Sequence, residues 1–224
     1  MKLVELLAQN PIFACLSSEE RMALTRAAIG RSYKKGEWIT HYGDIWPYLF
    51  VVEEGVITPI KESPDGRSLI IISLVEGEVF WGISFFLEDV PMPVALVAKE
   101  DSRISLWSHD HIKPLLLKNG QMSWELTRLM VRRMQHASDM VDVLAFQPVT
   151  GRLARLLLEH YREAVEDYVA RDMTLDEMAA RIGTTREMVC RQLYKFADQG
   201  AIQINRTEFM ISDPVYLKKI ARKG

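Results

Sequence analysis

The chain has 224 residues, of which 48% are apolar, enough to bury the cores of two domains. A formal net charge of −2 excludes a protein that coats nucleic acid through overall positive charge, although residues 147–224 carry 13 Lys and Arg against 11 Asp and Glu. The sequence has neither a membrane-length apolar run of roughly 18 residues nor a signal peptide, and its two cysteines form no motif, so we expect a cytoplasmic protein.

The first half of the chain predicts two helices followed by many short strands. Residues 3–29 place apolar groups at helical spacing, and Pro11 interrupts them, which predicts a short helix, a turn and a second helix. From Ser32 to about Trp107 the pattern changes to short β-rich runs between glycine turns. The predicted strands are 38–42, 48–52, 56–60, 68–75, 94–99 and 103–107. Many short strands at near-regular spacing favour a sandwich or barrel, and a jelly roll fits best.

A short helix over 108–117 precedes the longest helical pattern in the chain, at about 121–146. Apolar residues recur there at steps of three and four, as in a coiled-coil seam: Leu126, Met130, Met134, Ala137, Val141 and Leu144. This seam could meet a twin subunit, or it could belong to one broad stripe packed within a single chain. Gln147-Pro148 ends the helix, because a residue before proline avoids the α region, and an amphipathic helix over 150–169 follows.

Residues 174–196 predict two short helices joined by a tight turn. Thr174 and Glu177 form a capping box, and Thr184 and Glu187 repeat it ten residues later. Gly183 between them can adopt the positive φ that a sharp helix exit requires. The inward apolar set is Met178, Ala179, Ile182, Val189 and Leu193, and the outward face of the second helix carries Thr185, Arg186, Glu187, Cys190, Arg191 and Lys195. The pattern fits either a DNA-binding helix-turn-helix or an ordinary helical hairpin with a solvated charged face.

The stretch TTREMVCRQL resembles the recognition helix of the cyclic-AMP receptor protein/FNR (CRP/FNR) superfamily of bacterial transcription regulators, with its Arg-Glu-x-x-x-Arg core. Residues 144–158 resemble the hinge and following helix of this family, and residues 200–213 resemble its winged hairpin. The resemblance implies an α+β fold with an effector-sensing jelly roll similar to cyclic-nucleotide-binding domains (1–120), a dimerisation helix (121–146) and a winged helix-turn-helix (147–224). It also implies a homodimer that binds an inverted-repeat operator in double-stranded DNA, works with RNA polymerase and is not an enzyme.

The same resemblance assigns roles on the second helix. In a major groove, Arg pairs with guanine O6 and N7, and a carboxylate pairs with cytosine N4. We therefore expect base contacts from Arg186, Glu187 and Arg191, and phosphate contacts from Thr174, Thr185 and Arg206. Gln192 departs from the family at a usually apolar position, and Cys190 stands where relatives carry Ser or Gly. We expect Cys190 to face DNA, as a passive small residue or as a redox-sensitive thiol.

The predicted effector pocket departs from the cyclic-nucleotide pattern. Family members that bind cyclic nucleotides carry Gly-Glu for the ribose and Arg-Ser-Ala for the phosphate. Here Gly82 and Ala95 align with that pattern, but Ile83 replaces the Glu and Pro93-Val94 replaces Arg-Ser. Because a buried phosphate without a cation carries a large desolvation cost, the sequence disfavours cyclic AMP, although a cyclic-nucleotide regulator with an atypical pocket is an alternative. An iron–sulfur cluster is also disfavoured, since it needs four cysteine ligands.

What remains is an apolar pocket, expected to house haem, an aromatic or other apolar molecule, or nothing. Its predicted residues are Trp81, Gly82, Ile83, Phe85, Phe86, Met92, Pro93, Val94, His136, Ala137 and Ser138. His136 is the candidate haem ligand, and the alternative is that the aromatic residues are jelly-roll core. Two further alternatives are a cupin-like metal enzyme using His109 and His111, and an interaction protein that keeps the fold without binding DNA. The first lacks the Glu that a cupin motif requires, and the intact Arg-Glu-x-x-x-Arg core argues against the second.

Overall fold

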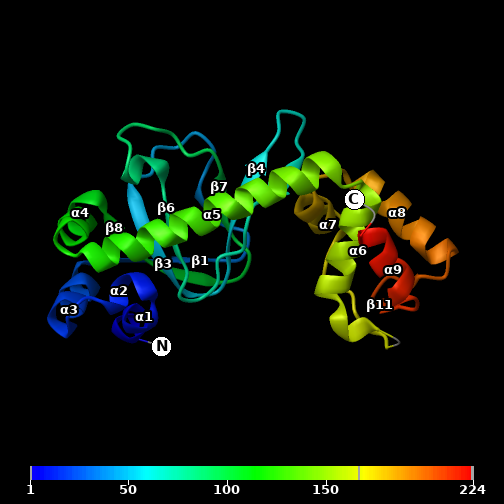
Figure 1. The fold of residues 1–224 in the computed structure, drawn as a ribbon, viewed down its shortest axis with the longest axis horizontal. Helices are drawn as coiled ribbons and strands as arrows, with labels where there is room; N and C mark the ends of the chain where they lie inside the picture. The colour runs from blue at the N-terminus through cyan, green and yellow to red at the C-terminus, as the bar shows by residue number, and fades with distance from the viewer. Residues whose placement is uncertain (1, 166, 223–224) are drawn as a thin grey trace. The chain divides into compact units, whose positions relative to one another are not determined.

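The computed structural model describes residues 2–165 and 167–222, and the chain divides into two compact units (Figure 1). The first unit consists of residues 1–61 and 71–135, and the second of residues 62–70 and 136–224. None of the described helices is long and apolar enough to cross a membrane.

Three short helices open the first unit: α1 (Leu3–Gln9), α2 (Pro11–Ala14) and α3 (Ser18–Ala27). Pro11 is the first residue of α2, where the missing amide of proline costs nothing, and the side chain of Asn10 accepts a hydrogen bond from the Ile12 amide (2.9 Å). The predicted interruption at Pro11 is confirmed.

The β region forms two four-stranded sheets, an arrangement that fits the predicted sandwich. Their orders are β1-β8-β3-β6 and β2-β7-β4-β5, and β8 pairs antiparallel with β1 and β3. The strands are β1 (Ile29–Tyr33), β2 (Trp38–Thr40), β3 (Tyr48–Glu54), β4 (Ile57–Glu62), β5 (Ser68–Ile70), β6 (Val79–Trp81), β7 (Ala95–Ala98) and β8 (Ser102–Ser108). Strands β1 and β6 were not predicted, and the predicted strand 68–75 is longer than β5.

Strand β3 is buried on both faces, and this places it between two cores. Phe50 and Val52 contribute to the core between the sheets, together with residues of β4, β7 and β8. Leu49 and Val51 point to the opposite face, where helices α1–α3 cover the sheet. The indole of Trp107 in this second core donates a hydrogen bond to the Leu24 carbonyl (2.8 Å).

Helix α4 (His109–Lys118) leads into the long helix α5 (Gly120–Phe146), whose first half runs alongside the strands (Figure 1). Leu126 is buried in the core beneath the helices, and Met130 packs against that core. Met134 and Val141, further along the predicted seam, are 68% and 63% exposed in the single chain. The seam is therefore buried or half-buried at Leu126 and Met130, exposed from Met134 to Val141, and half-buried again at Leu144.

The second unit contains four helices after α5 among the described residues: α6 (Val149–His160), α7 (Leu175–Ile182), α8 (Arg186–Asp198) and α9 (Pro214–Ala221). Strands β9 (Val169–Ala170), β10 (Ile202–Ile204) and β11 (Glu208–Ile211) form one sheet in the order β10-β11-β9. One buried cluster joins these elements. The predicted wing is confirmed, with β9 as an additional strand.

The predicted helix over 150–169 is wrong beyond His160. Tyr161 leaves the helical conformation (φ −102°, ψ 46°), and a 3₁₀ turn over Arg162–Ala164 follows. The Tyr161 hydroxyl accepts a hydrogen bond from the Met173 amide (3.3 Å), and Val169 pairs with Phe209 of β11. Tertiary contacts to the wing therefore outweigh the local helical pattern.

A buried arginine joins the end of α5 to α6 within the second unit. The Nη1 atom of Arg152 donates to the Leu144 carbonyl (3.1 Å), and the residue is only 8% exposed. Burial lowers the pKa of Arg152, and its Nε lies among the buried polar atoms without a hydrogen-bond partner. The carbonyl of Leu144 belongs to the last turn of α5, where a cation is favourable.

Candidate nucleic-acid interface and effector pocket

The turn between α7 and α8 has the geometry of a helix-turn-helix. Thr174 caps α7 through the capping box with Glu177, as predicted, and Gly183 ends it in the left-handed region (φ +62°, ψ 53°). The five apolar residues that we expected to face inward are all buried in one cluster: Met178, Ala179, Ile182, Val189 and Leu193.

The predicted second capping box, from Thr184 to Glu187, is wrong. The hydroxyl that caps α8 belongs to Thr185, which accepts a hydrogen bond from the Met188 amide (3.3 Å). The amide of Thr184 instead donates to the Ala179 carbonyl (3.0 Å), so Thr184 belongs to the end of α7. Glu187 is consequently the second residue of α8 rather than part of a box.

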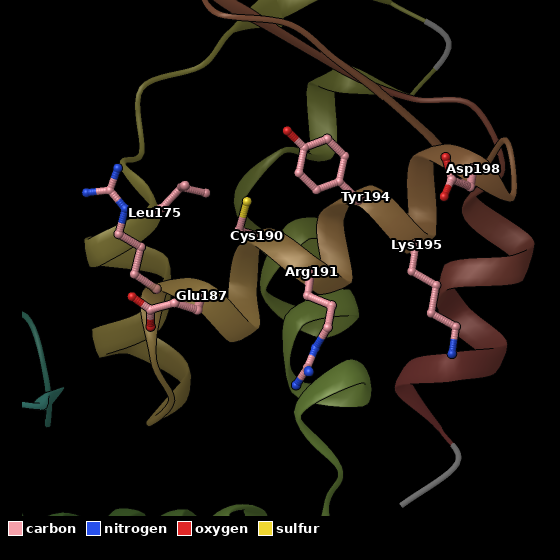
Figure 2. A pocket seen from close by; sticks show the side chains of 8 residues that line it. Leu175, Glu187, Cys190, Arg191, Tyr194, Lys195 and Asp198 are labelled. Carbon is pink, nitrogen blue, oxygen red and sulfur yellow. The ribbon is translucent and has the colours of Figure 1, made fainter.

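The outward face of α8 borders an open groove of about 680 Å³ (Figure 2). Figure 2 shows Arg191 and Lys195 extending from one side of α8, with Cys190 and Tyr194 on the other. The lining residues are Leu175, Arg186, Glu187, Cys190, Arg191, Tyr194, Lys195 and Asp198. The structure thus brings together the three predicted base-contacting residues and Cys190.

Electrostatic contacts organise the first turn of α8. The Nη1 atom of Arg186 lies 3.2 Å from Oδ2 of Asp176 on α7, and both side chains are largely exposed. Hydrogen bonds from its own backbone amide and from Thr185, together with the Arg186 charge, hold the pKa of Glu187 below its usual value. Nη2 of Arg191 donates to the sulfur of Met188 (2.8 Å). Arg186 is therefore flanked by two acids, Asp176 and Glu187, whereas Arg191 contacts the neutral side chain of Met188.

The three residues predicted to contact phosphates, Thr174, Thr185 and Arg206, lie at two helix caps and in the wing turn. Thr174 and Thr185 both use their hydroxyls as helix caps. Arg206, in the turn between β10 and β11, borders a second groove of about 330 Å³ that also touches Cys190 and Tyr194. Because these two residues border both grooves, α8 and the wing present one continuous surface.

Gln192, which departs from the usual apolar character of its position, has a partner in the structure. Its Oε1 accepts a hydrogen bond from the Thr150 hydroxyl at the start of α6 (3.1 Å). A polar contact thus replaces an apolar one between α6 and α8. Both residues lie in the second unit.

The predicted effector pocket is divided between a groove and two cores. Trp81, Ile83 and Phe86 border an open groove of about 530 Å³ together with Leu87, Leu116, Ser123, Leu126, Thr127 and Met130. Phe85 is buried beneath the helices, Met92 and Val94 pack between the sheets, and Pro93 is exposed. A Cβ at Gly82 would lie 1.8 Å from the Trp46 carbonyl oxygen, so this glycine permits a close backbone approach. His136, Ala137 and Ser138 lie on α5 in the second unit.

A half-buried arginine covers the aromatic residues beside this groove. The guanidinium of Arg133 lies 4.7 Å from the ring centre of Trp81 and 5.2 Å from that of Phe80, and it donates to the Val79 carbonyl. Burial lowers the pKa of Arg133 to about 10, and the nearby charge of Glu78 acts in the opposite direction. Arg133 was not among the predicted pocket residues, although it lies three residues after Met130 and therefore on the same helix face.

The two histidines of the metal-enzyme alternative make local contacts. Nδ1 of His109 lies 2.7 Å from the Phe85 carbonyl oxygen, and Nδ1 of His111 lies 3.0 Å from the Ser108 hydroxyl. Within residues 2–165 and 167–222, no group of three or more His, Cys, Asp or Glu side chains is placed to hold a metal ion.

Comparison with known proteins matches both units. Residues 30–119 match the cyclic nucleotide-binding domain family, and residues 151–220 match the Crp-like helix-turn-helix domain family. A CRP-like cAMP-activated global transcriptional regulator of Mycobacterium tuberculosis is 26% identical over 97% of this chain and 99% of its own length. The chain belongs to the CRP/FNR superfamily of transcription regulators.

Two solved structures support the fold of this CRP/FNR member. A transcriptional regulator assigned to the CRP/FNR family from Eubacterium rectale superposes with a TM-score of 0.78 at 20% identity, covering 95% of this chain and 98% of the other. The c-di-GMP responsive regulator CLP of Xanthomonas campestris superposes with a TM-score of 0.75 at 20% identity, covering 87% of this chain and 99% of the other. The predicted fold class is confirmed.

Proposed function

We propose that this CRP/FNR member is a homodimeric regulator that binds a specific inverted-repeat operator under the control of an effector other than cyclic AMP. The observation that carries the proposal is the grooved outer face of α8, where Arg186, Glu187 and Arg191 lie together. These residue types can pair with guanine and cytosine edges in a major groove. The wing, with Arg206 in its turn, adds a cation on the same surface for a backbone phosphate.

The exposed part of α5 supports a symmetric pair of subunits. Met134 and Val141, which lie on the same face of α5, are 68% and 63% exposed, although both are apolar. Two α5 helices packed against each other would remove these side chains from water. A twofold pair would also present two copies of α8, as an inverted repeat requires. In this proposal residues 121–146 dimerise, residues 1–120 sense the effector, and residues 147–224 bind DNA and, by family resemblance, act on RNA polymerase.

The effector proposal rests on the residues at the positions where cyclic-nucleotide members hold ribose and phosphate. Ile83 has no charge to hold a ribose hydroxyl, and it borders the apolar groove beside Trp81 and Phe86. Pro93 and Val94 have uncharged side chains, so neither supplies a cation for a phosphate. Pro93 is exposed, and Val94 packs into the core between the sheets. Such a site favours an apolar or aromatic molecule, with haem as one candidate.

One observation favours a second candidate, a cyclic-nucleotide regulator with an atypical pocket. Arg133 places a cation over Trp81, so an anionic ligand at the groove would have a partner from α5 rather than from the β-roll. Relatives differ in effector: the M. tuberculosis protein is named as cAMP-activated and the X. campestris protein as c-di-GMP responsive.

Two experiments test the proposal. Selection of bound duplexes from a random-sequence library by the full-length protein should yield an inverted repeat, and sedimentation should show a dimer. A monomer that enriches no sequence contradicts the proposed function. Calorimetric titration with cyclic AMP should show no binding, and an absorption spectrum of the purified protein tests for haem. Tight cyclic-AMP binding that Arg133→Gln abolishes would establish the second candidate instead.

A further inference from the structure

Asp176 and Arg186 form an ion pair beside the outward face of α8. Asp176 lies in the first turn of α7 and Arg186 begins α8, so the pair joins the two helices of the helix-turn-helix. Its atoms, Oδ2 and Nη1, are 3.2 Å apart, and the side chains are 69% and 61% exposed. An acid on α7 thus pairs with Arg186, a residue that we expect to contact a DNA base.

The geometry leaves Arg186 able to contact DNA while it is paired. A guanidinium has five N–H donors, and the ion pair with Asp176 engages Nη1. The Nη2 and Nε groups remain for guanine O6 and N7, which arginine contacts through two donors. An exposed arginine without a partner samples many rotamers, and ordering them on binding costs free energy. Pairing with Asp176 restricts these rotamers before DNA arrives.

The same acid opposes binding that is not sequence-specific. Such binding depends on neutralising phosphates with cations, and a carboxylate close to the groove repels phosphates. When Arg186 engages a base and stays paired with Asp176, the negative charge is compensated. When α8 contacts only the phosphate backbone of DNA, the uncompensated Asp176 carboxylate weakens binding. Specificity is a difference between two affinities, so a residue that weakens the wrong complexes raises it.

We propose that Asp176 is a positioning residue for DNA reading: it orients Arg186 toward one base pair and lowers affinity for other sequences. The proposal rests on the proposed function, since it requires that the protein read DNA at all. A structural role alone is the competing explanation, because any acid in the first turn of a helix interacts favourably with the helix dipole. Glu177 already supplies such an acid to α7 through its capping box.

The experiment compares Asp176→Asn with a matched control in the full-length protein. Asp198→Asn also removes one negative charge, from a residue at the opposite end of α8 that lines the groove beside Arg186. An operator obtained by selection with the unmodified protein is measured beside its single-base variants and a random-sequence duplex. We expect D176N to bind random DNA more tightly and to lose roughly tenfold in preference at one base pair of each half-site. D198N should strengthen binding to all duplexes by the same factor.

A double-variant comparison separates positioning from charge. Arg186→Ala should lose preference at the same base pair, and adding D176N to it should cause no further loss there. If D176N and D198N change every duplex alike, or if D176N keeps full preference at every base pair, the proposal is overturned. Asp176→Ser, which suits the first turn of a helix, replaces D176N if that variant unfolds. Failure of the unmodified protein to select any sequence would instead contradict the proposed function.

Discussion

Replacing Gly183 with alanine tests the turn that orients α8. The residue has a φ of +62°, and a Cβ there would lie 2.6 Å from Cδ2 of Leu144 and 3.3 Å from Cδ1 of Leu69. The left-handed backbone should cost an alanine about 1–2 kcal/mol, and displacing Leu144 from its rotamer about 0.5–1.5 kcal/mol. Since about 1 kcal/mol shifts the Tm of a domain of this size by roughly 4–8 °C, we expect the second unit to melt at least ~6 °C earlier.

Scanning calorimetry of the full chain is the appropriate assay, because two units need not unfold in one transition. Gly183→Asn is the matched control, since asparagine tolerates the left-handed region and adds the same Cβ. The asparagine variant should retain the destabilisation caused by the contact with Leu144 and avoid much of the destabilisation caused by the left-handed backbone. Compared with Leu144→Ala alone, the double variant with G183A should show only the destabilisation that comes from the left-handed backbone. A wild-type Tm for G183A, or equal losses for G183A and G183N, would refute the reasoning.

Three further predictions concern α8 and the core of the second unit. Arg191→Ala should cost ~1–3 kcal/mol at one base pair of each half-site in titrations with operator DNA, and an equal loss on random DNA would identify a backbone contact instead. Thr185→Ala should lower the free energy of unfolding by about 0.5–2 kcal/mol in urea, whereas Thr184→Ala should change it by less than about 0.5 kcal/mol; equal effects would contradict the assigned cap. Burial raises the pKa of Tyr161 from 10.0 to about 12, so the unfolded chain ionises first and the wild type should lose stability relative to Tyr161→Phe between those pH values. Parallel curves of unfolding free energy against pH would exclude this ionisation.

The parts of the fold that were predictable from sequence depend on local chemistry. The capping box at Thr174 and the left-handed exit at Gly183 are determined within a few residues, and both are confirmed. The choice between Thr184 and Thr185 was not predictable in the same way, because either hydroxyl can cap. It is settled by the Thr184 amide, which completes the end of α7.

The features that were missed depend on contacts between separate helices and strands. Strand β1 is mostly exposed and lacks alternation, and its pairing with β8 connects residues more than 60 positions apart. The contacts of Arg133 with Trp81 and of Asp176 with Arg186 likewise become visible only when the elements are assembled. The Arg-Glu-x-x-x-Arg core identified α8 as the second helix of the helix-turn-helix, but the sequence did not reveal that Asp176 pairs with Arg186.

The hydrogen bond from Arg152 to the Leu144 carbonyl has a consequence for movement at the predicted hinge, Gln147-Pro148. Any rotation of α6 away from the end of α5 would strip a buried guanidinium of this acceptor, at a cost of about 1–3 kcal/mol or more for a charged group. Rotation at this junction therefore carries an energetic cost that a linker without this hydrogen bond would not have.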